Sequence, residues 1–151
     1  SEMCIRDRSG TEPNLTADQE EHFFTYSLYP HAGTWREAGT EQEALNLNVP
    51  AKAVAGAAEK DRMEFLSVDK RDVVLETVKK AEDGDGVIVR LYEVENARTK
   101  VTLHCAEAIA SAEETDLLEN PIEGALGVKE NEIELTIKPY EIRTIRIRTA
   151  K

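Results

Sequence analysis

The sequence is short of the residue types on which many small domains depend. Its 151 residues include two cysteines and three histidines, too few for a disulfide framework or a cysteine-based zinc site. Aromatic residues make up only 5% of the chain, and no apolar run approaches the roughly 20 residues of a membrane-spanning helix. Positive charge is also scarce, and the net charge is −11. Such a field repels phosphates and anionic lipids, so we expect neither nucleic acid nor a membrane as a partner.

What remains is sufficient for one aliphatic core. Hydrophobic residues make up 40% of the chain and charged residues 32%, the proportions of a soluble globular protein. A chain of this length buries roughly 70% of the surface that its unfolded form exposes. Cys105 alternates with Val101 and Leu103, as a small core residue would. Two distant cysteines fit a reducing compartment, and we therefore expect a cytoplasmic protein.

The chain divides into a short irregular start and one long patterned region. Residues 1–17 have no period, and Ser1–Arg8 resembles a translated sequencing adapter. We therefore expect residues 1–17 to be disordered or non-native. Residues 18–151 are expected to form the folded region.

The patterned region is mostly β in character. Apolar residues alternate with polar ones at period two, most clearly in residues 132–138, and turn residues separate the runs. The strands expected from this pattern cover residues 21–29, 51–58, 64–68, 73–80, 87–92, 101–105, 132–138 and 142–148. Residues 106–115 could form a helix or an irregular strand. The spacing predicts an all-β fold, an antiparallel β-sandwich, in which residues 64–105 form a meander.

Local signals refine this prediction. Thr40 and Glu43 have the spacing of a capping box, and they predict a short helix near residues 40–47 that Pro50 ends. Asp83 and Asp85 alternate with Gly84 and Gly86, which indicates a tight hairpin turn rather than a metal loop.

Few side chains suggest chemistry. Near the C-terminus, Arg143, Arg146 and Arg148 are interpreted as the solvated face of a strand rather than a phosphate site. His31, Trp35 and Arg36 follow Pro30 in a loop, where functional groups are often presented. His31 could bind substrate or satisfy a loop carbonyl, and Trp35 could stack on a sugar or cover the core edge. No nucleophile and base pair, phosphate-binding loop or metal set is apparent, so no catalytic residue is assigned.

The order of several segments resembles the late β-domain of α-mannosidases of glycoside hydrolase family 38. The run Glu21–Arg36 resembles it first, with its aromatic strand and the loop that holds His31, Trp35 and Arg36. The likeness covers about residues 18–148 and continues in Phe65–Asp69, Val73–Ala81, Gly86–Glu93, Leu117–Pro121 and Ile137–Arg146. Glu20 and Phe23 depart from the pattern, because a glycine and an acid are expected there.

The resemblance implies a function for the parent protein rather than for this chain alone. The family consists of retaining α-mannosidases, whose paired carboxylates and divalent metal, usually zinc, belong to an N-terminal α/β barrel. This chain matches none of those motifs, so it is expected to be an inactive C-terminal accessory region without a cofactor. The implied partners are that barrel and mannose-containing glycans, and homo-oligomerisation stays open. The resemblance places His31, Trp35 and Arg36 at the domain junction or the substrate cleft.

Two other classes of function remain as alternatives. A stand-alone carbohydrate-binding module would need an exposed aromatic platform, and the low aromatic content counts against it. A structural or oligomerising β-domain would show an exposed apolar face.

Overall fold

A computed structural model describes residues 19–57 and 62–150. This part of the chain contains one helix and nine strands: α2 (Thr40–Asn48), β1 (Leu66–Val68), β2 (Val73–Lys80), β3 (Val87–Glu93), β4 (Thr99–Cys105), β5 (Ile109–Thr115), β6 (Pro121–Ala125), β7 (Val128–Lys129), β8 (Glu132–Ile137) and β9 (Ile142–Thr149). All strand pairs are antiparallel. The prediction that residues 1–17 are disordered or non-native concerns residues outside the described part.

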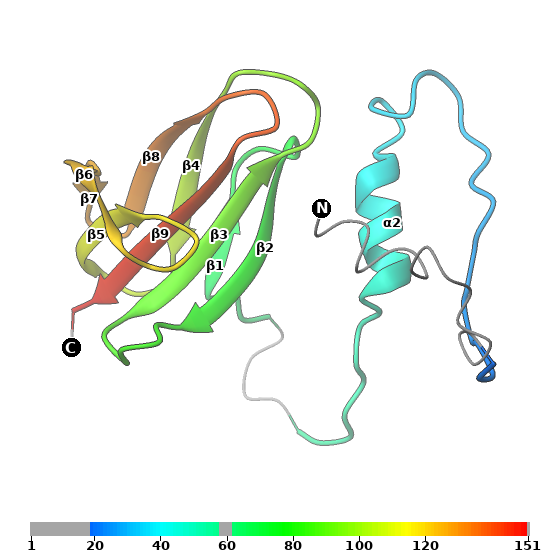
Figure 1. Cartoon of the computed structure of the whole chain (residues 1–151), viewed down its shortest axis with the longest axis horizontal. Helices are drawn as coiled ribbons and strands as arrows, with labels where there is room; N and C mark the ends of the chain where they lie inside the picture. Colours follow the sequence, from blue (N-terminus) through cyan, green and yellow to red (C-terminus); the bar gives the residue numbers. More distant parts are fainter. Residues whose placement is uncertain (1–18, 58–61, 151) are drawn as a thin grey trace, which may run out of the picture.

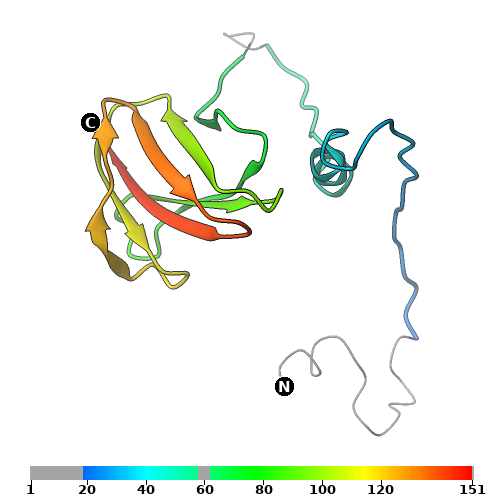
Figure 2. The ribbon, with the colours of Figure 1, turned by 90° about the horizontal axis from the view of Figure 1, so that it is seen from above.

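The strands form two sheets that face one another (Figures 1 and 2). One sheet has the order β1-β4-β8-β7 and the other the order β2-β3-β9-β5-β6. Aliphatic side chains from the facing sides of both sheets make the core, including Val89, Leu103, Ile133 and Ile145, each fully buried. The predicted all-β antiparallel sandwich with one short helix is therefore confirmed.

Several strands agree closely with the period-two pattern. Strand β2 has the expected bounds, and on β8 the side chains of Ile133, Leu135 and Ile137 are buried while the residues between them are not. Of the ambiguous residues 106–115, Ile109–Thr115 form strand β5, with a register shift between Ile109 and Ser111. Of the two alternatives, a helix or an irregular strand, the irregular strand is correct.

The β2–β3 hairpin turns where the two glycines predicted it. Gly84 has a φ of 80° and Gly86 a φ of 96°. A Cβ atom at Gly86 would lie 2.6 Å from the carbonyl oxygen of Ile147 on β9. Gly86 therefore meets two requirements at once, a positive φ and a close approach of two backbones.

The predicted meander over residues 64–105 is wrong in its pairing. Strand β1 pairs with β4, and β2 pairs with β3, so the chain crosses between the sheets at each end of the β2–β3 hairpin. Short links suggested neighbouring strands. A link of the same length can instead cross the edge of the sandwich, because the two layers lie only about 10 Å apart.

The strand expected over residues 21–29 is also absent, and so is the strand over residues 51–57, the described part of 51–58. Phe24, Tyr26 and Leu28 are 80%, 86% and 90% exposed, and no described strand pairs with this segment. Both views show α2 between the sandwich and residues 19–33 (Figures 1 and 2). Alternation indicates the direction of side chains, but a strand exists only where another strand pairs with it.

The helix forms where expected, but its capping box lies elsewhere. The residue before α2 is Gly39, in a left-handed conformation, and no side chain caps the helix. Thr34 and Glu37 instead bond one another in the preceding turn. Both pairs share the same spacing, so the sequence alone did not separate them.

Candidate functional site

The loop before α2 is fixed by its own side chains. The Glu37 carboxylate accepts hydrogen bonds from the Thr34 backbone N–H at 2.7 Å and from the Thr34 hydroxyl at 3.0 Å. The Thr34 backbone N–H and hydroxyl hold the pKa of Glu37 below its usual value. Gly33 has a φ of 73°, and a Cβ there would lie 2.5 Å from the Glu37 carboxylate, which would have to move. This geometry gives Glu37 a structural role.

Trp35 and Arg36 come together on this loop. The Arg36 guanidinium lies over the Trp35 ring at 5.0 Å from its centroid, a cation–π contact. The Trp35 carbonyl accepts the Thr40 N–H at 3.1 Å, so the loop is bonded directly to the first turn of α2. Trp35 is 40% exposed.

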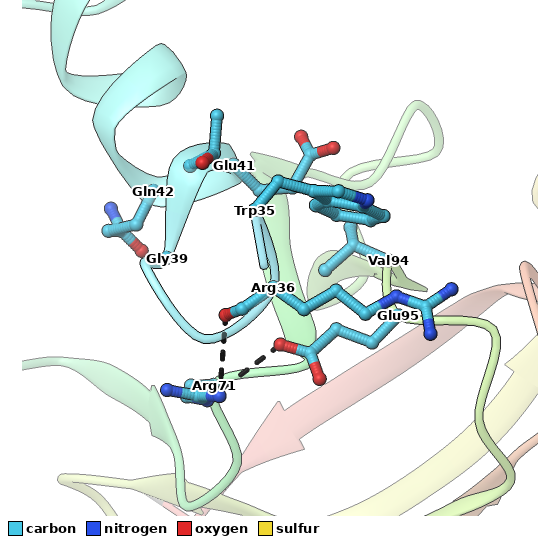
Figure 3. Close-up of a pocket in the computed structure, with 9 residues that line it drawn as sticks. Trp35, Arg36, Gly39, Glu41, Gln42, Arg71, Val94 and Glu95 are labelled. Carbon is cyan, nitrogen blue, oxygen red and sulfur yellow. Dashed lines mark hydrogen bonds and ion pairs between the residues drawn. The ribbon is translucent and has the colours of Figure 1, made fainter. Parts of the chain in front are cut away.

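Arg71 connects this loop to the sandwich. Its guanidinium donates to the Arg36 carbonyl at 3.4 Å and lies 3.7 Å from the Glu95 carboxylate, in the loop after β3. Trp35, Arg36 and Val94 line a cavity of about 200 Å³ between the helix start and the sandwich (Figure 3). The cavity thus offers an aromatic face with two guanidinium groups and two carboxylates (Glu41 and Glu95) around it.

His31 does not join Trp35 and Arg36. It is exposed, with its Nδ1 3.4 Å from the Ala32 carbonyl and its ring 5.6 Å from that of Tyr29. It does not line the cavity. Of the three predicted site residues, Trp35 and Arg36 therefore line one cavity and His31 lies outside it. Their role at a domain junction or substrate cleft stays a prediction.

Glu93 is a buried acid that sequence reasoning missed. It is 1% exposed. Its carboxylate accepts the backbone N–H groups of Glu95 at 2.7 Å, Ala97 at 3.0 Å and Tyr140 at 2.9 Å. Burial raises the pKa of Glu93, but these donors together hold that pKa below its usual value. The signal was present, because period two places Glu93 on the same face as Val89 and Leu91.

The arginines of β9 are not on a solvated face as predicted. Arg146 is 7% exposed, and its guanidinium lies 2.6 Å from Asp83 and 3.7 Å from Glu113. Arg148 pairs with Asp85 at 2.8 Å. The β2–β3 turn and strand β5 supply the acids that enclose them, and sequence-distant partners of this kind are invisible to a local pattern.

The two acids of the β2–β3 turn, Asp83 and Asp85, have a structural role. Asp83 accepts the Asp85 N–H at 2.9 Å as well as pairing with Arg146. The Asp85 N–H first, and Arg146 second, hold the pKa of Asp83 below its usual value. These residues close a turn and anchor it to β9.

The described residues contain neither a cluster of metal-ligating side chains nor a membrane-spanning helix. Within residues 19–57 and 62–150, no three histidine, cysteine or acidic side chains converge as metal ligands would. The zinc implied for the family therefore does not fit this part of the chain. The helix that the model describes is neither long nor apolar enough to cross a membrane.

Comparison with known proteins places the sandwich in a family. Residues 72–145 match the model described as the glycosyl hydrolases family 38 C-terminal beta sandwich domain. Over 145 residues the chain is 37% identical to Alpha-mannosidase 2C1 of Mus musculus. This alignment covers 91% of this chain and 14% of the mouse protein. Alpha-mannosidase 2C1 of Homo sapiens is 35% identical with the same shares, and Alpha-mannosidase G of Dictyostelium discoideum is 33% identical over 92% of this chain and 13% of its own length. The chain thus spans 13–14% of the curated relatives that it matches.

Proposed function

Because this chain belongs to glycosyl hydrolases family 38 through its C-terminal β-sandwich domain, we propose that it is the accessory region of an α-mannosidase. In this role it supports a separate catalytic part of the same parent protein and breaks no glycosidic bond itself. The likeness to named α-mannosidases over 91% of the chain is the observation that carries the proposal.

The carboxyl groups of the described residues support a non-catalytic role. A retaining glycosidase needs a nucleophile and a general acid roughly 5 Å apart, and the pKa of the general acid is raised by its surroundings. Here every carboxyl whose pKa clearly departs from its usual value has that pKa lowered: Glu37, Asp69, Asp83, Glu93, Asp116, Glu119 and Glu134. Their partners are backbone N–H groups, basic side chains, the Thr34 hydroxyl and the Asn120 amide, as in structural acids.

The contact with the catalytic part is proposed to include the Trp35 and Arg36 loop. Trp35 and Arg36 are both exposed, while the backbone of their loop is bonded to Arg71 and to α2. A rigid, partly apolar surface of this kind suits an interdomain contact. His31, exposed on the same loop, belongs to the proposed contact but not to the cavity.

The remaining features of the parent are part of the same proposal. A divalent metal, expected to be zinc, would be held by the catalytic part, and mannose-containing glycans would be its substrates. A cytoplasmic location and self-association stay predictions. No alternative class of function has a separate observation in its favour that outweighs the family match.

Two experiments test this proposal. The purified 151-residue chain is incubated with 4-nitrophenyl α-D-mannopyranoside with and without added Zn²⁺, and we expect no release of nitrophenol. Turnover that co-purifies with the chain would refute the accessory role. Separately, the parent protein is compared with a truncation that lacks residues 19–151, and we expect the truncation to lose thermal stability and soluble activity. A fully stable and active truncation would contradict a supporting function.

A further inference from the structure

Residues 22–29, which we call the aromatic segment, expose a run of large apolar side chains. Phe23, Phe24, Tyr26 and Leu28 are all at least 80% exposed. The chain has only three Phe, four Tyr and one Trp, and five of these eight aromatic residues lie within residues 23–35. So many exposed apolar side chains in one place indicate a surface that another structure covers.

The aromatic segment also lacks charge. No Asp, Glu, Lys or Arg lies between Glu21 and Arg36, in a chain whose residues are 32% charged. Strand edges that remain in water are usually protected by charged side chains. An uncharged run rich in aromatic residues has instead the composition of a strand that is paired and partly buried.

The side chains of the aromatic segment lie on two faces. The rings of Phe24 and Tyr26 stack with their centroids 6.3 Å apart, and period two places Leu28 on the same face. The other face lies toward α2, because Ser27 and Tyr29 line a cavity with side chains of that helix. Both views show α2 between this segment and the sandwich (Figures 1 and 2). The face with the two stacked rings is therefore the one left uncovered.

The end of the aromatic segment is fixed to the loop before α2. The Tyr29 hydroxyl donates to the Ala38 carbonyl at 3.2 Å. Pro30 follows and has no backbone N–H, so a ladder of strand pairing would end at Tyr29. A partner on this segment would thus lie close to the loop that holds Trp35 and Arg36.

The edges of the sandwich do not suit the aromatic segment. They are β1 and β7 in one sheet, and β2 and β6 in the other. Strand β1 has three residues, β7 has two, and β6 begins with Pro121. Strand β2 is longer, but its register shifts between Leu75 and Thr77, and it ends in Lys79 and Lys80. Short, bulged or lysine-bearing edges resist a further strand, so neither this sandwich nor that of a second copy offers a suitable edge.

The comparisons indicate where a suitable edge lies. The alignment with the mouse relative covers 91% of this chain, which leaves about 14 of the 151 residues outside it. Residues 22–29 lie further than that from both ends, so the alignment includes them. The match to the family's sandwich model begins only at residue 72. The aromatic segment thus corresponds to a part of the relative that precedes its sandwich model, and the chain spans only 14% of that relative.

We propose that the aromatic segment adds as a strand to the edge of a β-sheet in the part of the parent protein that this chain does not contain. Its backbone N–H and C=O groups pair with that edge, and Phe24, Tyr26 and Leu28 pack on the apolar face of that sheet. The inference rests on the proposed function, because it requires a longer parent. It goes further by making the contact a pairing of backbones rather than only a contact of side chains.

The test is hydrogen–deuterium exchange, measured by mass spectrometry on the parent protein and on the isolated chain. In the isolated chain the amides of residues 22–29 should exchange as fast as those of an unstructured peptide. In the parent we expect exchange to be slower by about 100-fold or more, because a paired strand exchanges only when it opens.

Two substitutions in the parent separate the two faces of the segment. Tyr26→Lys places a charge in the proposed apolar contact and should speed exchange at residues 22–29 by about tenfold or more. Thr25→Lys, one position away on the opposite face, is the matched control and should leave exchange within about twofold. Both should leave the melting temperature of the isolated chain unchanged, since both positions are exposed there.

Three results would overturn the inference. One is fast exchange at residues 22–29 in the unsubstituted parent, a result that does not depend on how the variants fold. Another is an equal effect of the two substitutions. The third is protection in the isolated chain that rises with its concentration, together with a dimer in light scattering, because the partner would then be a second copy. Mannoside turnover by the isolated chain would refute the proposed function instead, and it would leave the exchange result unaffected.

Discussion

Replacing Glu93 by glutamine changes one buried atom and should lower the stability of the whole sandwich. The Glu93 carboxylate joins the loop after β3 to the turn before β9 through three backbone N–H groups. Glutamine keeps one carbonyl acceptor, but it turns an NH₂ group toward N–H donors. A hydrogen bond to a charged group contributes about 1.5–3 kcal/mol, and a buried donor left without an acceptor costs about 1–3 kcal/mol. We therefore expect the free energy of unfolding to fall by about 2–4 kcal/mol.

The effect of Glu93→Gln should also depend on pH. Because the folded-state pKa of Glu93 lies below the reference value of 4.5, its carboxylate stabilises the fold fully above that value. This contribution is lost as the pH falls through the lower folded-state pKa. The difference in stability between the original chain and the variant should therefore be constant near neutral pH and shrink in acid.

The assay for Glu93 is urea unfolding followed by circular dichroism at several pH values. A decrease of a few kcal/mol corresponds to a melting temperature lower by roughly 10 °C in a domain of this size. Glu107→Gln is the matched control, because Glu107 is exposed and should change stability by less than about 0.5 kcal/mol. If both variants unfold alike, or if the difference grows in acid, the bonding assigned to Glu93 is wrong.

Three further tests, two of them with a matched control variant, address other parts of the fold, each by thermal and urea unfolding. Gly86→Ala should cost about 2–4 kcal/mol, because its Cβ would lie 2.6 Å from a β9 carbonyl, whereas Gly84→Ala meets only a flexible side chain and should cost about 1 kcal/mol. Equal costs would refute the close approach of the two backbones. Arg146→Met should cost about 1.5–3 kcal/mol, since it removes the hydrogen bonds from the buried guanidinium to Asp83 and to the Glu119 carbonyl, and Arg148→Met under about 1 kcal/mol. The reverse order would contradict the burial of the first. Arg36→Ala should leave the stability of the isolated chain within about 0.5 kcal/mol, because its cation–π contact is exposed. A large loss would make it a structural residue rather than an interdomain one.

The strands with a clear hydrophobic alternation could be predicted from sequence. On β8 the burial of Ile133, Leu135 and Ile137 follows from the pattern alone, because one face of a sandwich sheet meets the core. The β2–β3 turn followed from its two glycines, whose conformations few other residues adopt. The resemblance to the mannosidase family also rested on local segments in order, and the comparisons confirm it.

The sites were less predictable because their parts are distant in the sequence. The cavity beside Trp35 combines residues from the loop before α2, from α2 and from the loops next to β2 and β3, and no spacing rule connects Trp35 with Val94. Arg146 alternates as an exposed residue would, but acids from the β2–β3 turn and β5 enclose it. His31, Trp35 and Arg36 were grouped because they are close in sequence, and the structure brings together only the last two.

Sequence by itself determined which way the side chains of the clearly alternating strands point, where the β2–β3 turn falls and which family the chain resembles. Each of these depends on residues within a few positions of one another, through side-chain alternation and the φ that a residue tolerates. Only the tertiary structure decided that β1 pairs with β4, that residues 21–29 pair with none of the described strands, and that the Glu93 carboxylate accepts the Tyr140 N–H in the turn before β9. Those outcomes depend on which backbone groups meet across the fold, and pairing between distant segments leaves no mark on either segment alone.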